Sequence, residues 1–276
     1  EVVSHLNWSK KGPKPRIESS EPEYDNEELL GILSEDLKSA VDIKEIIARF
    51  VDGSRFEEFK PLYGSSLVCG WASVHGYQIG IIGNNGPIYP ESAEKGASFI
   101  QLCNKRDIPL VFLHNVTGFL VGKDFERQGI IKKGSQLINA VSNSMVPHIT
   151  FIVGASYGAG TYAMSGKAFN NRFTFLWPTA KIAVMGPEQM AGVMSIVREA
   201  KAKRDGKKFD KKADEQLKAM VIDYLEKLSH GLVASSMMTD DGIIDPRDTR
   251  DVIGFCLSIV SNNVIEGASE YGVFRL

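Results

Sequence analysis

The sequence predicts an α/β domain built on a largely parallel β-sheet. Two short apolar runs, residues 109–115 and 148–153, each follow a segment of helical periodicity and precede a loop that contains glycine. Strands that alternate with helices are typical of parallel sheets with right-handed crossovers, and ligands bind such sheets in the loops that follow the strands. With 276 residues, of which 43% are hydrophobic and 24% charged, the chain can bury one large core.

The first 26 residues differ from the rest of the chain. They contain Pro13, Pro15 and Pro22, many charges and little apolar periodicity, which predicts an extended arm or linker. Because the chain begins with glutamate rather than methionine, a fragment or processed product is expected. We therefore expect an arm over residues 1–26 that joins a missing N-terminal domain, followed by one domain over residues 27–276.

Hydrophobic periodicity and turn residues predict the elements in order. Predicted helices cover residues 27–33, 42–50, 91–106, 125–145, 187–203, 211–230 and 247–264. Predicted strands cover residues 67–74, 77–83, 109–115, 148–153, 173–177 and 181–185. His75 and Gly76 fit a tight hairpin between the first two strands.

The composition excludes several functional classes. The 32 basic and 34 acidic residues leave a net charge of −2, which is too balanced for a nucleic-acid or membrane-surface footprint. Cys69, Cys103 and Cys256 lack the spacing of a disulfide framework or zinc site, so no metal is expected. No apolar run reaches the roughly 18 residues that a membrane span requires.

The segment GASYGAG, from Gly154 to Gly160, follows an apolar strand and opens a predicted helix. Exposed backbone N–H groups at such a turn suit a negatively charged ligand atom. The G-x3-G-x-G spacing is not the dinucleotide fingerprint, and Gly166-Lys167 is followed by Ala168 rather than by the Ser or Thr of a phosphate loop. Spacing alone leaves two interpretations open, an anion site and a glycine turn that only permits close packing.

A second loop, residues 115–122, occupies the same position after the preceding strand. Its Gly118-Phe119 pair could present another backbone donor, and two such donors would form an oxyanion hole. The alternative is an ordinary connecting loop with a buried Phe119.

Side chains for acid, base or nucleophilic catalysis are harder to find. His114 and His148 each lie beside an apolar strand, where a single histidine is more often structural than catalytic. Ser156 lies in G-A-S-Y-G rather than in the G-x-S-x-G motif of serine hydrolases. The sequence therefore offers loops suited to an oxyanion but no convincing catalytic side chain.

Several segments together resemble a known family. They are LYGSSLVCGWASVHGYQIGIIGNNG from Leu62, SAEKGASFIQLCNKRDIPLVFLHNVTGFLVG from Ser92, GASYGAGTYAM from Gly154, FLWPTAKIAVMG from Phe175 and DDGIIDPRDTR from Asp240. The chain resembles the C-terminal half of the carboxyltransferase β subunits of biotin-dependent acyl-CoA carboxylases, in the 3-methylcrotonoyl-CoA and geranoyl-CoA branch. The resemblance covers nearly the whole chain, including its proline-bearing start and the closing YGVFRL.

The resemblance implies a crotonase-like fold, a superhelix of repeated ββα units of the kind found in ClpP and crotonase. Family subunits have two such domains, and this chain resembles the second. The active site lies between the N-terminal domain of one subunit, which holds the acyl-CoA, and the C-terminal domain of a partner, which receives carboxybiotin. The implied partners are a biotin carboxylase and biotin carrier α subunit and further β subunits in a hexamer, in the mitochondrial matrix or the bacterial cytoplasm.

The resemblance also implies site residues. In the family, backbone N–H groups of the glycine-rich turn hold the ureido oxygen of biotin, which corresponds here to Gly158 and Ala159, with Gly118 and Phe119 as the complement. The expected biotin-binding residues are Thr117, Ser156, Tyr157 and Gly160. The expected acyl-CoA contacts are Gly83, Asn84, Asn85 and Gly86.

The implied reaction moves the carboxyl group from carboxybiotin to an acyl-CoA, with 3-methylcrotonoyl-CoA of leucine degradation as the expected substrate. Biotin itself would accept the substrate proton, so no protein base is required, and the isolated chain is expected to be inactive. Two alternatives remain open. One is a crotonase-like enoyl-CoA hydratase or isomerase, for which Glu188 is the candidate carboxylate. The other is a non-catalytic assembly half-module.

Overall fold

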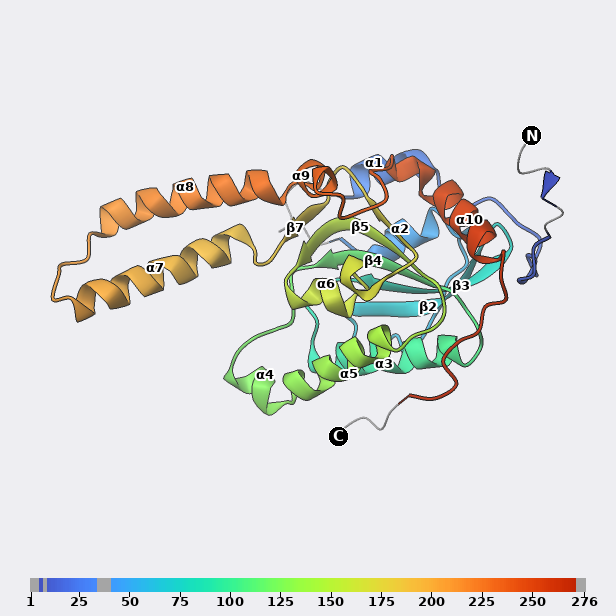
Figure 1. Cartoon of the computed structure of the whole chain (residues 1–276), viewed down its shortest axis with the longest axis horizontal. Coiled ribbons are helices and arrows are strands. Elements are labelled where there is room, and N and C mark those ends of the chain that lie inside the picture. Colours follow the sequence, from blue (N-terminus) through green and yellow to red (C-terminus); the bar gives the residue numbers. More distant parts are fainter. Residues whose placement is uncertain (1–4, 7–8, 34–40, 272–276) are drawn as a thin grey trace.

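A computed structural model describes residues 5–6, 9–33 and 41–271. Within them, a seven-stranded sheet has the order β1-β2-β3-β4-β5-β6, with β7 beside the end of β5 (Figure 1). Strands β3 to β6 are parallel, whereas β1, β2 and β3 are antiparallel neighbours. The strands are β1 Glu57–Glu58, β2 Leu67–Val74, β3 Tyr77–Asn84, β4 Leu110–Val116, β5 His148–Tyr157, β6 Phe173–Leu176 and β7 Lys181–Ala183. The predicted α/β class and parallel sheet are confirmed.

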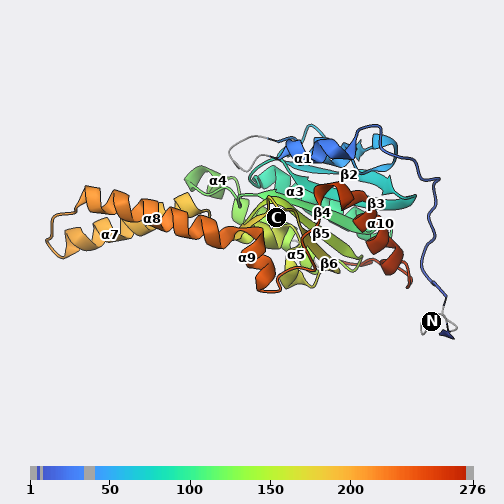
Figure 2. The same cartoon turned by 90° about the horizontal axis from the view of Figure 1, so that it is seen from above.

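Helices cover both faces of the sheet (Figures 1 and 2). They are α1 Leu29–Ile32, α2 Ile43–Ala48, α3 Pro90–Asn104, α4 Lys123–Arg127, α5 Ile130–Ser142, α6 Ala159–Ala163, α7 Pro187–Arg204, α8 Lys211–Ser229, α9 Gly231–Ser236 and α10 Thr249–Val260. A Cβ on Gly80 of β3 would lie 2.7 Å from Cys103 Sγ of α3, and one on Gly83 would lie 2.7 Å from Ile43 Cγ1 of α2. Because side chains three apart on a strand point to opposite faces, α2 and α3 pack on opposite sides of the sheet.

Strand β5 pairs with three other strands, β4, β6 and β7. All ten of its residues are buried, which is expected for a strand covered on both faces and hydrogen-bonded along both edges. The prediction ended this strand at Val153, but pairing with β4 and β7 extends it to Tyr157. Most of the glycine-rich segment is therefore strand, and the turn itself is confined to Gly158.

The single helix predicted over residues 125–145 is wrong in one respect. Gly129 adopts a left-handed conformation with φ 87°, which ends α4 and begins α5. Glycine reaches this region without the steric cost that a Cβ imposes, so the break occurs at this residue. Figure 1 accordingly shows α4 and α5 as two separate helices, with α4 following the loop after β4.

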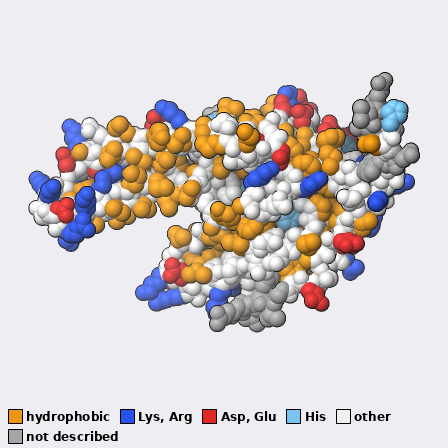
Figure 3. All heavy atoms as spheres, viewed as in Figure 1, with side chains coloured by type: hydrophobic (Ala, Val, Ile, Leu, Met, Phe, Trp, Pro, Cys, Tyr) orange, Lys and Arg blue, Asp and Glu red, His pale blue; other side chains and the backbone are white. Residues whose placement is uncertain are grey.

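Helices α7 and α8 form an antiparallel hairpin that projects from the body (Figures 1 and 2). Asp214 of α8 joins them, because its buried carboxylate accepts hydrogen bonds from Ser195 Oγ at 2.5 Å and Arg198 Nε at 2.8 Å. Apolar side chains are exposed along the hairpin, whereas charged side chains gather at its tip (Figure 3). The exposed apolar residues include Val193, Met194, Ile196, Val197, Leu217 and Met220.

The predicted arm runs in extended form along the body over residues 9–25. The N–H groups of Lys11 and Gly12 donate to Asn262 O and Ser261 O, both at 3.1 Å, and Arg16 N donates to Gly76 O at 3.0 Å. The arm is thus attached to the body by backbone hydrogen bonds. In the described part of the chain, no helix combines the length and apolar character needed to span a bilayer.

Candidate active site at the carboxyl edge of the sheet

The two glycine-bearing loops meet at the edge of the sheet where the parallel strands end. The loop after β4 contains Gly118, and the turn after β5 contains Gly158. A Cβ on Gly160 would lie only 2.8 Å from Val116 Cγ2 and 3.2 Å from Gly118 Cα, so the loops are in direct contact. Since the carboxyl edge of a parallel sheet is where ligands bind in this class of fold, their junction is the candidate site.

Gly158 shapes the turn but does not offer its N–H to a ligand. Its backbone has φ 55° and ψ −135°, a conformation that is strained for residues with a Cβ, and an added Cβ would lie 2.9 Å from Val184 O. Its N–H donates to Ala183 O of β7 at 3.0 Å. The assignment of Gly158 as a hydrogen-bond donor to biotin therefore conflicts with this structure, because β7 already uses that donor.

Ala159 presents the accessible donor. It is exposed and is the first residue of α6, where no preceding helical turn can accept from its N–H. No described residue accepts a hydrogen bond from the N–H of Ala159 or of Gly160. Because Gly160 is buried, Ala159 N–H is the donor of this pair that a ligand can reach.

The loop after β4 supplies further donors. Ile88 N donates to Gly118 O at 3.0 Å, and Leu120 N donates to Ile88 O at 3.1 Å. In such a parallel bridge the backbone N–H and C=O of Phe119, the residue between Gly118 and Leu120, point away from Ile88. The N–H groups of Gly118 and Phe119 have no acceptor among the residues described. The predicted pair of loops with backbone donors is thus present.

The remaining predicted biotin residues differ in exposure. Thr117 is exposed at the start of the loop, whereas Tyr157 is buried at the end of β5. Ser156 is fully buried, with its Oγ 2.9 Å from His114 Nδ1 and 2.9 Å from Thr161 Oγ1. Ser156 therefore supports the turn from inside the domain.

Ser156 and His114 are the residue types of a nucleophile and its base, but both side chains are fully buried. His114 Nε2 lies 2.6 Å from Met164 O, a contact that requires this nitrogen to carry the proton. Burial lowers the pKa of His114 to about 4, and the hydrogen bond to Met164 O only partly opposes this. A neutral imidazole that accepts from Ser156 Oγ at Nδ1 accounts for the geometry, and the pair has a structural role.

We expect Ser156→Ala to lower the free energy of unfolding by about 1–3 kcal/mol, because buried His114 Nδ1 would lose its donor. Chemical denaturation measures this loss. Because the hydroxyl is buried, the affinity of a ligand bound at the glycine turn should remain close to that of the wild type. A clearly weakened affinity would instead support direct contact between Ser156 and the ligand.

The four predicted acyl-CoA contacts lie at the end of β3, on the same edge of the sheet. Gly83 packs against Ile43, and Asn85 Oδ1 accepts from Ile43 N at 2.7 Å, so both position α2. Gly86 has φ 137° and no neighbour where a Cβ would project. Asn84 is fully buried, and neither of its side-chain polar atoms has a hydrogen-bond partner.

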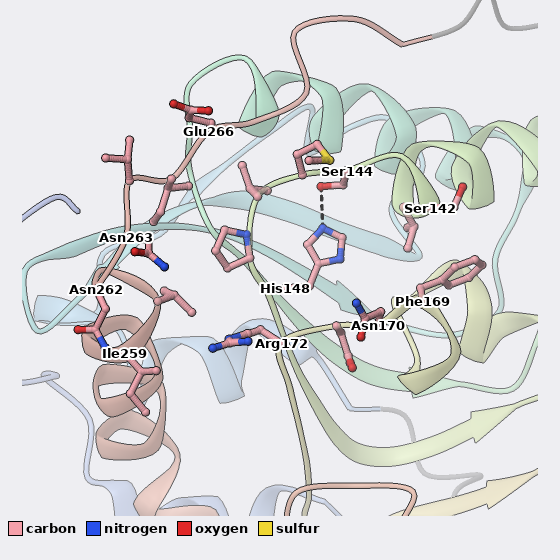
Figure 4. A pocket seen from close by; sticks show the side chains of 18 of the residues that line it. Ser142, Ser144, His148, Phe169, Asn170, Arg172, Ile259, Asn262, Asn263 and Glu266 are labelled. Atoms are coloured by element: carbon pink, nitrogen blue, oxygen red, sulfur yellow. Dashed lines mark hydrogen bonds between the residues drawn. The ribbon is translucent and has the colours of Figure 1, made fainter. Parts of the chain in front are cut away.

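A cavity of about 960 Å³ lies at the opposite edge of the sheet from the glycine turn, where β5 begins (Figure 4). His148 in its wall is held through Nε2 by Ser144 Oγ and through Nδ1 by Ser165 Oγ, both at 2.7 Å. Burial lowers the pKa of His148 to about 4. The length of β5 separates this cavity from the glycine turn, and His148, like His114, is bonded within the domain.

Comparison with known proteins identifies the family. Residues 1–271 match the model of the carboxyl transferase domain. The chain belongs to the carboxyl transferase domain family. It is 55% identical over 276 residues to a probable biotin-dependent acyl-coenzyme A carboxylase β2 subunit of Mycobacterium tuberculosis, covering all of this chain and 52% of the relative. It is 48% identical over 277 residues to the mitochondrial methylcrotonoyl-CoA carboxylase β chain of Dictyostelium discoideum. This match covers 100% of this chain and 47% of the relative.

The fold of this carboxyl transferase domain is also found in solved structures. The β subunit of Pseudomonas aeruginosa geranyl-CoA carboxylase superposes with a TM-score of 0.88 at 42% identity, covering 99% of this chain and 52% of that one. The predicted crotonase-like fold is confirmed. The chain spans about half the length of the curated relatives that it matches.

Sequence reasoning found the two loops, but it did not show which of their backbone N–H groups already donate a hydrogen bond within the domain. The bond between Gly158 and Ala183 depends on the parallel pairing of β7 with β5, which no local pattern reveals. The buried Ser156–His114 pair was likewise missed. A histidine and a serine near the ends of two neighbouring apolar strands are a signal that could have suggested it.

Proposed function

We propose that this carboxyl transferase domain is the biotin-side half of an acyl-CoA carboxylase, and that it receives the carboxyl group from carboxybiotin for transfer to an acyl-CoA thioester. The observation that carries the proposal is the exposed Ala159 N–H, without an acceptor in the described structure, beside the Gly118–Phe119 loop. Preorganised backbone donors of this kind stabilise an oxygen that gains negative charge. They need no acidic, basic or nucleophilic side chain.

Carboxybiotin, carried by a partner subunit, would supply the carboxyl group and afterwards the base that removes the substrate proton. The chain's own contribution is positioning and electrostatic stabilisation. Ala159 N–H would donate to the ureido oxygen, and the Gly118–Phe119 loop would complete the set of donors. Gly158 would hold the turn in the conformation that aims Ala159, through its bond to β7. The neutral, buried His114 would take no part in proton transfer.

The substrate we propose is 3-methylcrotonoyl-CoA, with geranoyl-CoA as the close alternative, because relatives that carry these names match the chain over nearly its whole length. Leucine degradation would be the corresponding pathway. The proposed partners are a biotin carboxylase and biotin carrier α subunit and further β subunits of the same kind. Mitochondrial and bacterial relatives both exist, so the proposed compartment is the mitochondrial matrix or the bacterial cytoplasm.

The test uses the full-length protein joined to its biotin-carrying partner. Incorporation of labelled bicarbonate into 3-methylcrotonoyl-CoA and geranoyl-CoA, dependent on ATP and abolished by avidin, is the expected result. Hydration of crotonoyl-CoA without the biotin partner would instead favour the hydratase alternative, and Glu188 in the first turn of α7 would then be the carboxylate to replace. Absence of both activities would leave the assembly module as the remaining interpretation.

A further inference from the structure

The pairing of β4 with β5 changes register just before the two donor loops begin. Up to His114, which pairs with Ile152, each residue of β4 pairs with the residue of β5 that lies 38 positions later in the chain. The next pair, Val116 with Ser156, is 40 positions apart. One residue of β4 therefore lies opposite three residues of β5. Extra residues in a strand redirect the chain locally, and such irregularities are common beside active sites.

The shifted register brings the proposed donors of the two loops to the same level. When the new offset is continued into the loops, Phe119 lies level with Ala159. With the original offset, Val121 would lie there instead, and the loop after β4 would be displaced by two residues. The contact between the loops agrees with the shifted register, because a Cβ on Gly160 would lie 3.2 Å from Gly118 Cα.

Asn115 is the residue of β4 that lies opposite the three residues of β5. Its Oδ1 accepts a hydrogen bond from Ala155 N at 3.3 Å, so a side chain of β4 bonds the backbone of β5 at the irregularity. A Cβ on Gly154 would lie only 2.5 Å from the same oxygen. Glycine at this position therefore leaves the space that the Asn115 amide occupies.

We propose that Asn115 and Gly154 fix the shifted register, and that Asn115 is a positioning residue for carboxyl transfer. The inference rests on the proposed function, because the groups that the register aligns are the donors proposed for the ureido oxygen. Asn115 acts through the backbone, since it sets the level at which the loop after β4 meets the turn after β5. Oxyanion donors act over a narrow range of distance, and a displacement of about 1 Å can slow a reaction by about 10²-fold.

The experiment measures single-turnover carboxyl transfer and the KM for 3-methylcrotonoyl-CoA in the full-length enzyme with its biotin-carrying partner. Asn115→Leu keeps the size of the side chain but removes the acceptor, and we expect the rate to fall by about 10–100-fold. The KM should stay close to that of the wild type, because the proposed donors act on the ureido oxygen rather than on the thioester. Asn115→Asp keeps an acceptor for Ala155 N–H and should retain most of the rate.

Asn143→Leu is the matched control for the loss of an asparagine amide. Asn143 is exposed, and its Nδ2 donates only to Asn139 O and Ser142 Oγ at the end of α5. The rate and the KM should both remain unchanged in this variant.

A double-mutant cycle separates register control from general damage to the fold. Gly154→Ala should displace the Asn115 amide and slow transfer to a similar extent as Asn115→Leu. In an Asn115→Ala background the space is already empty, so Gly154→Ala should cause little further loss. Residues that act through one contact give such non-additive effects, whereas independent damage would be additive.

Three results would overturn the inference. Wild-type rates in Asn115→Leu, with the fold intact by circular dichroism, would show that the amide does not position the donors. Equal losses in Asn115→Asp and Asn115→Leu would show that the acceptor for Ala155 N–H is not the group that matters. Additive losses in the cycle would separate Gly154 from Asn115, and the cycle decides the question even where Asn115→Leu does not fold. Failure of the wild-type enzyme to carboxylate any acyl-CoA would instead contradict the proposed function itself.

Discussion

Replacing Ala159 with proline is expected to slow carboxyl transfer by about 10²–10³-fold, the usual effect of removing one oxyanion-hole donor. The change deletes a single N–H group. Proline is tolerated at the first position of a helix, where its φ is already suitable and the missing N–H has no intrahelical acceptor. The turn and α6 should therefore remain folded. Single-turnover transfer from carboxybiotin to acyl-CoA in the full-length enzyme measures the effect.

Ala159→Gly is the matched control, because it keeps the N–H and removes only the methyl group. We expect its rate to stay close to that of the wild type. Gly158→Pro is a poor probe of the same question, since it would break the bond to Ala183 and the positive-φ turn together. Wild-type rates in Ala159→Pro, with the fold intact by circular dichroism, would remove Ala159 N–H from the proposed mechanism.

Replacing Asp52 with alanine is expected to lower the free energy of unfolding by about 3–5 kcal/mol, the range for breaking a buried ion pair from one side. The Asp52 side chain is completely buried and accepts from Arg250 Nη2 and Gly76 N, both at 2.8 Å. Arg250 also donates to Phe50 O and Ser20 O. Without the carboxylate, the buried guanidinium would keep only its neutral acceptors and the exposed carboxylate of Glu21, 3.5 Å from Arg250 Nε, which is the physical origin of the loss.

The ion pair between Asp52 and Arg250 also connects distant parts of the chain. Arg250 belongs to α10, Asp52 to the turn before β1, and Ser20 to the arm. Urea denaturation of the isolated chain measures the change in stability. Asp251→Ala is the control on the next residue, because Asp251 is 83% exposed in its pair with His75. Exposed pairs contribute about 0–1 kcal/mol, so a similar loss in both variants would contradict the special role of Asp52.

The stability that Asp52 provides should depend on pH in a defined direction. Burial opposes ionisation of Asp52, but hydrogen bonds from Gly76 N–H and Arg250 outweigh it, and its pKa lies below the usual value. The contribution is therefore fully present above the unfolded pKa of about 4 and is lost as the pH falls through the folded pKa. The difference in unfolding free energy between wild type and Asp52→Asn should accordingly shrink in acid.

Much of the fold could be predicted because its signals are local. The hairpin at His75–Gly76 follows from two runs of strand propensity with a two-residue gap. The helix predicted over residues 42–50 is present as α2, and Asp42 caps it by accepting from Lys44 N. The glycine-bearing loops were found because each follows a buried apolar strand. Boundaries were less predictable, since Gly129 divides a continuous helical pattern and β7 extends β5 beyond Val153.

By itself, the sequence determined the class of fold, the order of its elements, the two loops that could hold an oxyanion and the family that they resemble. Tertiary structure alone decided which backbone donors are available. Gly158 and Ala159 are adjacent and chemically alike in sequence, but strand β7 accepts from Gly158, while nothing in the described chain accepts from Ala159. The loop after β4 likewise depends on contacts distant in sequence, because Phe119 packs over Gly134 only after the loop and α5 meet. Hydrogen-bond saturation and cavity shape arise from such non-local packing, so no local pattern can specify them.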